Sequence, residues 1–473
     1  MTLYDYIIIG GGISGLATCM KLPNTSKILC LEQLSRFGGR IHSKHIVTDD
    51  GTYIIEKGAA RFHKQQQNIM NMLTTLQMTD QIVPYPSDIK YTDNTTEGPF
   101  QIIKEVIHHI QNDKKELVST YTFLDYAKSK LSKSRFQSLT SNFEYMETIQ
   151  FMNAYEVTKI IHNYDPSTQY FTLKEGLSSC IDKMVDYIRN KHTNVDLKSR
   201  ISVLDVLPNH DNQWECITDN KTYRAKKVIF TIPGKFLGNF SVSSHFKSHL
   251  DSVHYRNLNR VYGLYDKKEP WMNYERIKTN ENNKYMISHG KMQLLSYTDG
   301  KMADYWFQMN LKDKTLDEIH KCTETIFTNT SKPKQVFSFY WKHGLGIWKP
   351  GTNINEVRKQ MINPLPNLYI GGDTFSAYQN WIDGALENTN AVVDYVLQDV
   401  QEVQDDVQLP IVKVRKSSKA QNKTQNKAYH KDKTRRKQNS KMYSLEEIKH
   451  HNTKKDAWIA IGKSVYDITS WIP

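Results

Sequence analysis

The stretch that decides the fold is YDYIIIGGGISGLATCMKLPNTSKILCLE, residues 4–32. It opens with an apolar run, Tyr4–Ile9, that has the length and composition of a buried strand. The run leads into a Gly-x-Gly-x-x-Gly turn and a helical pattern, with the glycines at Gly10, Gly12 and Gly15. A second apolar run, Lys27–Leu31, ends in Glu32. This order of strand, glycine turn, helix, strand and acid predicts the first βαβ unit of a dinucleotide-binding α/β fold.

Each residue type in this unit suits a dinucleotide. Gly10 permits the tight turn, Gly12 lets the backbone approach a pyrophosphate, and Gly15 lets the helix pack closely on the strand. The helix N-terminus then directs the positive end of its dipole at the phosphates. Glu32 can accept both hydroxyls of an adenosine ribose and would repel a 2′-phosphate, so NADP is disfavoured. A glycine-rich turn without a ligand is the alternative.

Composition indicates a globular protein with room for about three domains. The chain has 473 residues, of which 38% are hydrophobic, 24% charged and 11% aromatic, too many aromatics for a disordered chain. No window reaches the ~18 consecutive apolar residues of a membrane span, and the glycines near the N-terminus argue against a signal peptide. The cysteines are odd in number and lack Cys-x-x-Cys spacing, which predicts neither disulfides nor a metal site and favours a reducing, intracellular compartment. They are Cys19, Cys30, Cys180, Cys216 and Cys322.

The net charge of +13 is concentrated near the C-terminus. Residues 413–441 hold twelve Lys/Arg against one acid, Asp432, so that the rest of the chain is nearly neutral. We expect 411–441 to be a disordered, solvated linker. Contact with nucleic acid or an anionic surface is an alternative, and Lys433-Thr-Arg-Arg-Lys could add a nuclear address to a cytoplasmic protein.

Further along, helical and strand patterns alternate in long blocks. The spacing of apolar residues predicts helices over about 100–165. Strand patterns return at 200–206, 227–233, 258–265, 293–297 and 336–341, and a last strand-turn-helix unit covers 367–395. This return to strands predicts an α/β domain that is interrupted by insertions.

The segment after Glu32 distinguishes between cofactors. Ser35-Arg-Phe-Gly-Gly-Arg-Ile-His-Ser combines two glycines, which let the chain press on a cofactor, with Arg40, whose guanidinium can hold phosphate oxygens. Here the sequence resembles the flavin-containing amine oxidases, which include monoamine, polyamine and L-amino acid oxidases. The resemblance covers about residues 1–400 and implies FAD as the cofactor.

Three further segments carry the resemblance. Glu56-Lys-Gly-Ala-Ala-Arg-Phe-His resembles the glycine segment that runs along the flavin. Tyr369-Ile-Gly-Gly-Asp resembles the segment whose acid reaches the ribityl-phosphate region, and Trp381-Ile-Asp-Gly-Ala-Leu-Glu the helix start that faces the flavin's pyrimidine oxygen. The resemblance implies these cofactor contacts: Gly10, Gly12, Ser14, Gly15, Glu32, Gln33, Gly39, Arg40, Gly58, Ala59, Ala60, Arg61, Val203, Gly372, Asp373, Trp381, Ile382 and Ala385.

The resemblance also implies substrate contacts. Arg61 ends a Gly-x-x-Arg run that binds the substrate carboxylate in L-amino acid oxidases, although a lone arginine is more often a surface ion pair. Tyr297 matches a carboxylate-binding tyrosine, although the following Asp-Gly also fits a simple hairpin turn. Trp381 and Trp348 are expected to wall the substrate channel, with two core tryptophans as the alternative. Asn380 replaces the family's glycine before Trp381, which could alter substrate access.

Two departures qualify the expected chemistry. Arg260 stands where the family has a lysine that holds a water near the flavin, and an arginine cannot be deprotonated, so reactivity with oxygen is in question. No cysteine lies near 344–351, where covalent members tether FAD, so we expect noncovalent binding.

The last residues resemble the first half of a cytochrome b5 domain, through Asp456-Ala-Trp458 and Val465-Tyr-Asp-Ile-Thr469. The sequence stops at Pro473, before that family's His-Pro-Gly-Gly ligand segment, and His450 and His451 do not occupy ligand positions. About thirty residues cannot bury a stable core. We expect no haem and interpret the segment as a truncated or decayed module.

These expectations combine into a Rossmann-like FAD domain interleaved with an α+β substrate domain. The FAD domain is expected to comprise 1–75, 170–245 and 355–410, and the substrate domain 76–169 and 246–354, followed by the linker and the fragment 442–473. The expected activity is oxidation of an amine or L-amino acid by hydride transfer to FAD, with oxygen as acceptor. The alternatives are a polyamine- or desaturase-type flavin oxidoreductase, or a catalytically weak flavoprotein that acts through its basic tail.

Overall fold

The computed structural model describes residues 2–92, 99–143, 145–160 and 168–405, and short strands between 452 and 467. The chain forms two compact units, Met1–Gln408 and Leu409–Pro473. The expected basic linker at 411–441 and the two histidines at 450 and 451 lie outside the described residues. The second unit contains an antiparallel sheet of β18 (Asn452–Thr453), β19 (Asp456–Ile461) and β20 (Ser464–Asp467).

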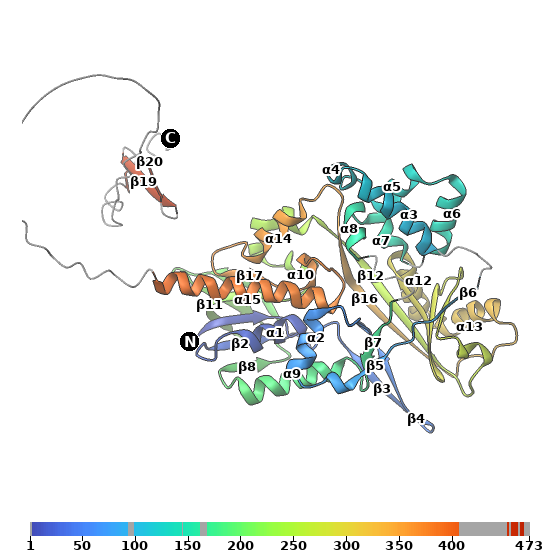
Figure 1. The fold of residues 1–473 in the computed structure, drawn as a ribbon. Helices are drawn as coiled ribbons and strands as arrows, with labels where there is room; N and C mark the ends of the chain where they lie inside the picture. The colour runs from blue at the N-terminus through green and yellow to red at the C-terminus, as the bar shows by residue number, and fades with distance from the viewer. Residues whose placement is uncertain are drawn as a thin grey trace, which may run out of the picture. The chain divides into compact units, whose positions relative to one another are not determined.

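The first unit contains a seven-stranded sheet (Figure 1). Its order is β8-β2-β1-β11-β10-β9, and β17 pairs with β11. The bounds are β1 (Leu3–Ile9), β2 (Ile28–Leu31), β8 (Val195–Lys198), β9 (Val203–Pro208), β10 (Trp214–Thr218), β11 (Thr222–Phe230) and β17 (Leu368–Ile370). The pairs among β8, β2, β1, β11 and β17 are parallel, whereas β9 and β10 are antiparallel. The mixed α/β fold predicted from the first βαβ unit is confirmed.

Both faces of this sheet are covered, as the continuous apolar run of β1 requires. Ile8 packs into a core with α1 (Ile13–Lys21), α2 (Gln67–Thr75), α9 (Ser178–Lys191) and α15 (Ile382–Asp405). Ile7 and Ile9 point to the opposite face, which packs against η3 (Ser241–Phe246), α10 (Gly234–Leu237) and α14 (Ile354–Ile362). Alternation along one strand therefore supplies two cores.

A second sheet lies beside the first in the same unit (Figure 1). Its order is β16 (Gln335–Trp348), β12 (Val253–Leu264), β15 (Met292–Asp299), β14 (Tyr285–His289), β13 (Arg276–Lys278) and β6 (Ile89–Tyr91). Helices α12 (Gly300–Leu311) and α13 (Thr315–Ile326) share a core with it. Two-stranded sheets pair β3 (Ser43–Thr48) with β4 (Gly51–Glu56), and β5 (Ile82–Pro84) with β7 (Phe171–Leu173). The remaining short elements are η1 (Thr79–Gln81), α11 (Lys247–Leu250), η4 (Pro270–Asn273) and η5 (Asp373–Phe375).

The stretch predicted to be helical forms a separate group of helices (Figure 1). They are α3 (Pro99–Asn112), α4 (Lys115–Val118), α5 (Phe123–Lys130), α6 (Lys133–Asn142), α7 (Met146–Phe151) and α8 (Ala154–Ile160). In α3, buried Ile102, Ile103, Val106 and Ile110 recur at helical spacing. Within the described parts of the chain, no helix has the length and apolar character to cross a membrane, and all five cysteines are buried and free. The expected boundaries between the FAD domain and the substrate domain stay a prediction.

The hairpin alternative for Asp299-Gly300 is wrong, because β15 runs directly into α12 at this point. Asp299 is buried and pairs with the equally buried Arg256 of β12. Gly300 has φ +55°, and a Cβ there would lie 1.8 Å from the carboxyl carbon of Glu147. The glycine is therefore favoured mainly by its positive φ, because the Glu147 carboxyl group is the end of a flexible side chain that can shift.

Asp299→Asn tests how much the fold depends on this ion pair. The substitution leaves the Arg256 guanidinium buried without its carboxylate, which costs about 3–5 kcal/mol of unfolding free energy. Urea denaturation followed by circular dichroism measures the loss. The control is Asp317→Asn, which breaks the exposed pair with Lys332 and should leave the denaturation midpoint nearly unchanged. Equal midpoints for the two variants would contradict the assignment.

Candidate cofactor and substrate site

A cavity of about 660 Å³ opens where β1 and β2 end. Its walls include residues from the first glycine turn, the segment after β2, the start of β9, and the region where β17 leads into α15. Most of the expected cofactor contacts line it, namely Gly10, Gly12, Ser14, Glu32, Gln33, Gly39, Arg40, Gly58, Ala59, Val203, Gly372, Asp373, Trp381, Ile382 and Ala385. Segments that are hundreds of residues apart thus meet around one space.

The glycine turn is shaped by a close approach of backbone to backbone. A Cβ at residue 15 would lie 1.9 Å from the Gly10 carbonyl oxygen. Gly15 does not line the cavity itself; it lets α1 sit against the end of β1. Gly12 caps α1 and has only the Gly39 Cα, 3.9 Å away, in contact range of a Cβ. The N-terminus of α1 therefore borders the cavity without side chains in between, as phosphate binding requires.

Glu32 lies at the end of β2 and is buried. Its Oε2 accepts a hydrogen bond of 2.7 Å from the Gly11 backbone NH, and its Oε1 one of 2.8 Å from the Leu34 NH. These bonds fix the carboxylate at the cavity wall. Each oxygen keeps acceptor capacity, so the pair can receive the two hydroxyls of a ribose.

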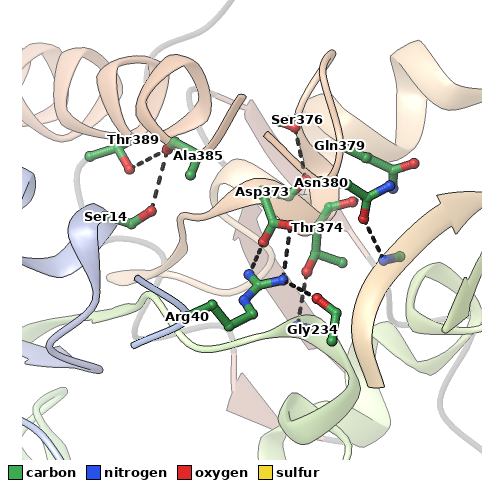
Figure 2. A network of polar contacts seen from close by, with 12 residues as sticks. Ser14, Arg40, Gly234, Asp373, Thr374, Ser376, Gln379, Asn380, Ala385 and Thr389 are labelled. Atoms are coloured by element: carbon green, nitrogen blue, oxygen red, sulfur yellow. Dashed lines mark hydrogen bonds and ion pairs between the residues drawn. The ribbon is translucent and has the colours of Figure 1, made fainter. Parts of the chain in front are cut away.

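Arg40 and Asp373 form an ion pair across the cavity wall (Figure 2). Arg40 Nη1 also donates to the Gly344 carbonyl at 2.7 Å. The two residues come from the second glycine segment and from the start of η5, and both were expected to contact the cofactor. Their pairing holds the guanidinium in place and lowers the charge that faces the cavity.

A second helix N-terminus reaches the same cavity. Ile382 and Ala385 in the first turn of α15 line it. Ser14 Oγ donates to the Ala385 carbonyl at 3.4 Å, which ties α15 to the first turn of α1 (Figure 2). Two helix N-termini, the Glu32 carboxylate and glycine-bearing walls fit a flavin dinucleotide, because helix N-termini would stabilise its negatively charged phosphates and the carboxylate could accept from its ribose hydroxyls.

One end of the cavity is aromatic. Trp381 lines it and is nearly parallel to Tyr170, with ring centroids 6.4 Å apart and an angle of 8° between planes. His63 stands edge-on to both rings. Tyr297 also lines the cavity, and Arg260, its cross-strand neighbour, lies with its guanidinium carbon 4.3 Å from the Tyr297 ring centroid.

Arg61 lies just beyond this aromatic end. Its guanidinium carbon is 4.4 Å from the Tyr170 ring centroid and 5.8 Å from that of Tyr85. Among the residues that the structure describes, it has these ring contacts and no hydrogen-bond acceptor or carboxylate. A guanidinium held by aromatic faces keeps its NH groups available for an anionic ligand.

Asn380, which stands where the family has a glycine, adopts a left-handed backbone conformation. Its φ is +70°, which asparagine tolerates better than most residues. Its side-chain oxygen accepts from the Gly346 backbone NH at 2.8 Å, so the residue fastens the loop before α15 to β16 (Figure 2). Asn380 itself lines the cavity.

Some expected residues lie elsewhere. Trp348 was expected to wall the substrate channel, and this is wrong, because it is 1% exposed and packs in the core beside Phe375. Its place at the apolar end of β16 explains the burial. Arg260, Arg61 and Ala60 adjoin the aromatic end but are not among the cavity-lining residues.

Sequence reasoning missed three residues at the site. Tyr170 stacks with Trp381, and Trp341 lines the cavity while its Nε1 donates to the Lys57 carbonyl at 2.6 Å. Arg276, on β13, lies with its guanidinium carbon 5.6 Å from the Tyr170 ring centroid. None of them belongs to a motif, and contacts between elements that are distant in sequence bring them there.

This fold and cavity define a dinucleotide-binding oxidoreductase of the flavoprotein class. Residues 127–397 match the family described as "Flavin containing amine oxidoreductase", and residues 8–76 match an NAD(P)-binding Rossmann-like domain. The chain belongs to the flavin-containing amine oxidoreductase family, as its sequence motifs predicted, and its cofactor is a flavin. Residues 444–473 match the cytochrome b5-like haem/steroid binding domain.

The chain is also similar to known proteins in sequence and in fold. The chain is 19% identical to the flavin-dependent L-tryptophan oxidase RebO of Lentzea aerocolonigenes, over 82% of this chain and 96% of that protein. Its fold is similar to a putrescine oxidase solved with putrescine (TM-score 0.68, 13% identity, 84% of this chain, 99% of the other). It is also similar to the cyclohexylamine oxidase of Brevibacterium oxydans IH-35A (TM-score 0.67, 13% identity, 85% and 100%).

A separate match covers a short part of the chain. Over 36 residues the chain is 53% identical to an acyl-lipid (8-3)-desaturase of Physcomitrium patens. The matched part is 8% of this chain and 8% of the desaturase. The expectation that the C-terminal segment binds no haem stays a prediction.

Glu32→Gln tests the ribose contact. The amide keeps the shape but removes the charge, and a hydrogen bond to a charged group contributes about 1.5–3 kcal/mol. We expect the Kd for FAD to rise on the order of 10- to 100-fold, measured by titrating FAD into apoprotein. Glu215→Gln, on β10 of the same sheet, is the matched control. FAD affinity equal to that of the control would contradict the role of Glu32.

Proposed function

We propose that this protein binds FAD noncovalently and oxidises the CH–NH2 group of an L-amino acid, with oxygen as the electron acceptor. The products are an imine, which hydrolyses to a keto acid and ammonia, and hydrogen peroxide. The observation that carries the proposal is Arg61, a guanidinium without an acceptor among the described residues, next to the stacked Tyr170 and Trp381.

FAD, when bound, supplies the acceptor for the hydride of the substrate's Cα–H bond. Arg61 would bind the substrate carboxylate through a pair of charge-assisted hydrogen bonds, which fixes one end of the substrate. Trp381 and Tyr170 would restrict the orientation of the amine end by their ring faces. Tyr297, on the cavity wall, is the second proposed carboxylate contact.

The charges around the site favour the neutral amine that hydride transfer needs. Arg61 and Arg260 are both cationic, and neighbouring positive charge disfavours a protonated ammonium group. Arg260 replaces the family's lysine, and its charge persists because it is held against the Tyr262 hydroxyl (3.2 Å) and the Glu56 carbonyl (3.3 Å). No separate base is required if the amine binds in its neutral form.

Arg61→Met separates amino acid oxidation from amine oxidation. Two hydrogen bonds to the carboxylate, at about 1.5–3 kcal/mol each, predict a fall of at least ~100-fold in kcat/KM for L-amino acids. Anaerobic loss of the flavin's visible absorbance, with pooled L-amino acids and then with polyamines, is the measurement. Arg189→Met, an exposed arginine on α9, is the control. Reduction by polyamines alone would refute the carboxylate clamp and favour the polyamine-type alternative.

Denaturation tests the noncovalent attachment. None of the five free cysteines lines the cavity, which supports a flavin held only by hydrogen bonds and packing. Acid precipitation of the holoenzyme should therefore leave FAD in the supernatant. Yellow colour that remains with the pellet would contradict noncovalent binding.

Hydrogen peroxide formed in proportion to the substrate consumed would support oxygen as the acceptor.

A further inference from the structure

A second cavity adjoins the one that we assign to the cofactor, and we call it the lysine cavity. Its volume is about 720 Å³, which is enough for a small organic molecule. Residues of α10, η3 and α11 line it, together with the start of β12 and the C-terminal part of β16. Asn239, Phe240 and His343 line both cavities, so the two spaces share part of a wall.

The lysine cavity is fastened to the middle of the cofactor cavity. Gly234, which lines the lysine cavity, donates its backbone NH to Thr374 Oγ1 at 2.9 Å (Figure 2). Thr374 follows Asp373, which pairs with Arg40 at the cofactor cavity. Trp381, at the aromatic end, lines the cofactor cavity and does not line the lysine cavity. A ligand here would therefore lie beside the bound dinucleotide and away from the proposed substrate position.

Lysines give the lysine cavity its charge. Lys235, Lys247 and Lys349 line it, and Asp251 is the one carboxylate among its described lining residues. These lysines and the aspartate leave a net charge of +2 on the walls. Within the described chain, none of the three ammonium groups forms an ion pair or a hydrogen bond. The Lys235 ammonium lies 5.9 Å from the Tyr255 ring centroid, which leaves its charge in place.

Two further acids act on the walls of the lysine cavity, and both have partners elsewhere. Asp373 acts on Tyr255, but it is paired with Arg40. Asp304 acts on His343, but it accepts hydrogen bonds from two neutral side chains on β12 and β16. Neither acid forms an ion pair with a lysine of the cavity among the described residues.

The walls also carry polar groups without partners. His254 Nε2, His343 Nδ1 and the Tyr255 hydroxyl are buried and have no hydrogen-bond partner within the described residues. Burial and then nearby cations lower the pKa of both histidines, so the rings are neutral at pH 7. Lys349 is one of the cations that act on His254, which shows that its charge reaches this wall. A ligand rich in oxygen atoms would satisfy such groups.

We propose that the lysine cavity binds a phosphate monoester, a small organic molecule whose phosphate is held by Lys235, Lys247 and Lys349. A phosphate monoester carries a charge of about −1.5 to −2 at pH 7 and several acceptor oxygens. Its charge matches the net charge of the walls, and lysine is a common ligand of phosphate. The organic part would occupy the rest of the volume, against Phe240 and Tyr255. This second site goes beyond the proposed oxidation, since it does not involve the substrate end.

Calorimetric titration of the holoenzyme tests the site while FAD fills its own cavity. We expect ribose 5-phosphate to bind at least ten times more tightly than ribose and than succinate, at equal ionic strength. Succinate carries a similar charge without a phosphate, so equal binding of succinate would overturn the phosphate ligand. The flavin fluorescence should stay unchanged during the titration. Release of FAD as the ligand binds would place the ligand in the cofactor cavity and overturn the second site.

Lys349→Gln assigns the phosphate contact to a residue. Loss of a hydrogen bond between charged groups should raise the Kd for ribose 5-phosphate on the order of tenfold or more, with the FAD content unchanged. Lys359→Gln, an exposed change on α14 that lines neither cavity, is the control. Equal Kd values for variant and control would overturn the assignment. Lys247→Gln, an exposed change on α11, should weaken binding in the same direction and serves if Lys349→Gln does not fold.

AMP distinguishes between two sources of the phosphate. Tighter binding of AMP than of ribose 5-phosphate would support a nucleotide, and equal binding would support a sugar phosphate. No binding of AMP, ribose 5-phosphate or glycerol 3-phosphate to the holoenzyme would overturn the proposal, whatever substrate reduces the flavin.

Discussion

Helix α1 and strand β1 meet so closely that a methyl group at residue 15 would lie 1.9 Å from the Gly10 carbonyl oxygen. A second contact of this kind occurs at Gly58, where a Cβ would lie 2.0 Å from the Arg40 carbonyl oxygen. Hydrogen bonds from Gly38 to Gly11 and from Ala59 to Arg40 hold the same three segments together. The cavity depends on this backbone packing, because a side chain at either glycine would push apart the walls that carry Glu32 and Arg40.

The arginines of this structure have two kinds of partner. Where arginines support the fold, as at Arg256 with Asp299, the chain supplies a carboxylate partner from an adjacent strand or loop. Around Tyr170 the direct contacts of the arginines are tyrosine rings, hydroxyls and carbonyls, and Glu275 acts on Arg276 only electrostatically. Neutral partners hold a guanidinium in position and do not neutralise its positive charge, so the group can still bind an anion.

The parts of the site that the sequence predicts are those built from local patterns. The glycine turn, Glu32 and the start of α15 follow from spacing, since turn geometry and helix starts are properties of neighbouring residues. Tyr170 and Arg276 could not be predicted in this way, because contacts between elements distant in sequence bring Tyr170 to Trp381 and Arg276 to Tyr170. Trp348 illustrates the converse: its motif position resembled a channel wall, yet strand alternation and the adjoining Phe375 place it in a core.

Strand β17 and the first turn of α15 enter the structure late in the chain, beside β11 and α1. The N-terminal glycine turn is therefore synthesised some 370 residues before the segments, up to Ala385, that complete its cavity. Contacts of such high sequence separation form late in folding. A chain that ends before Ala385 therefore lacks one wall of the cavity, so the space for the cofactor is complete only after most of the protein has been synthesised.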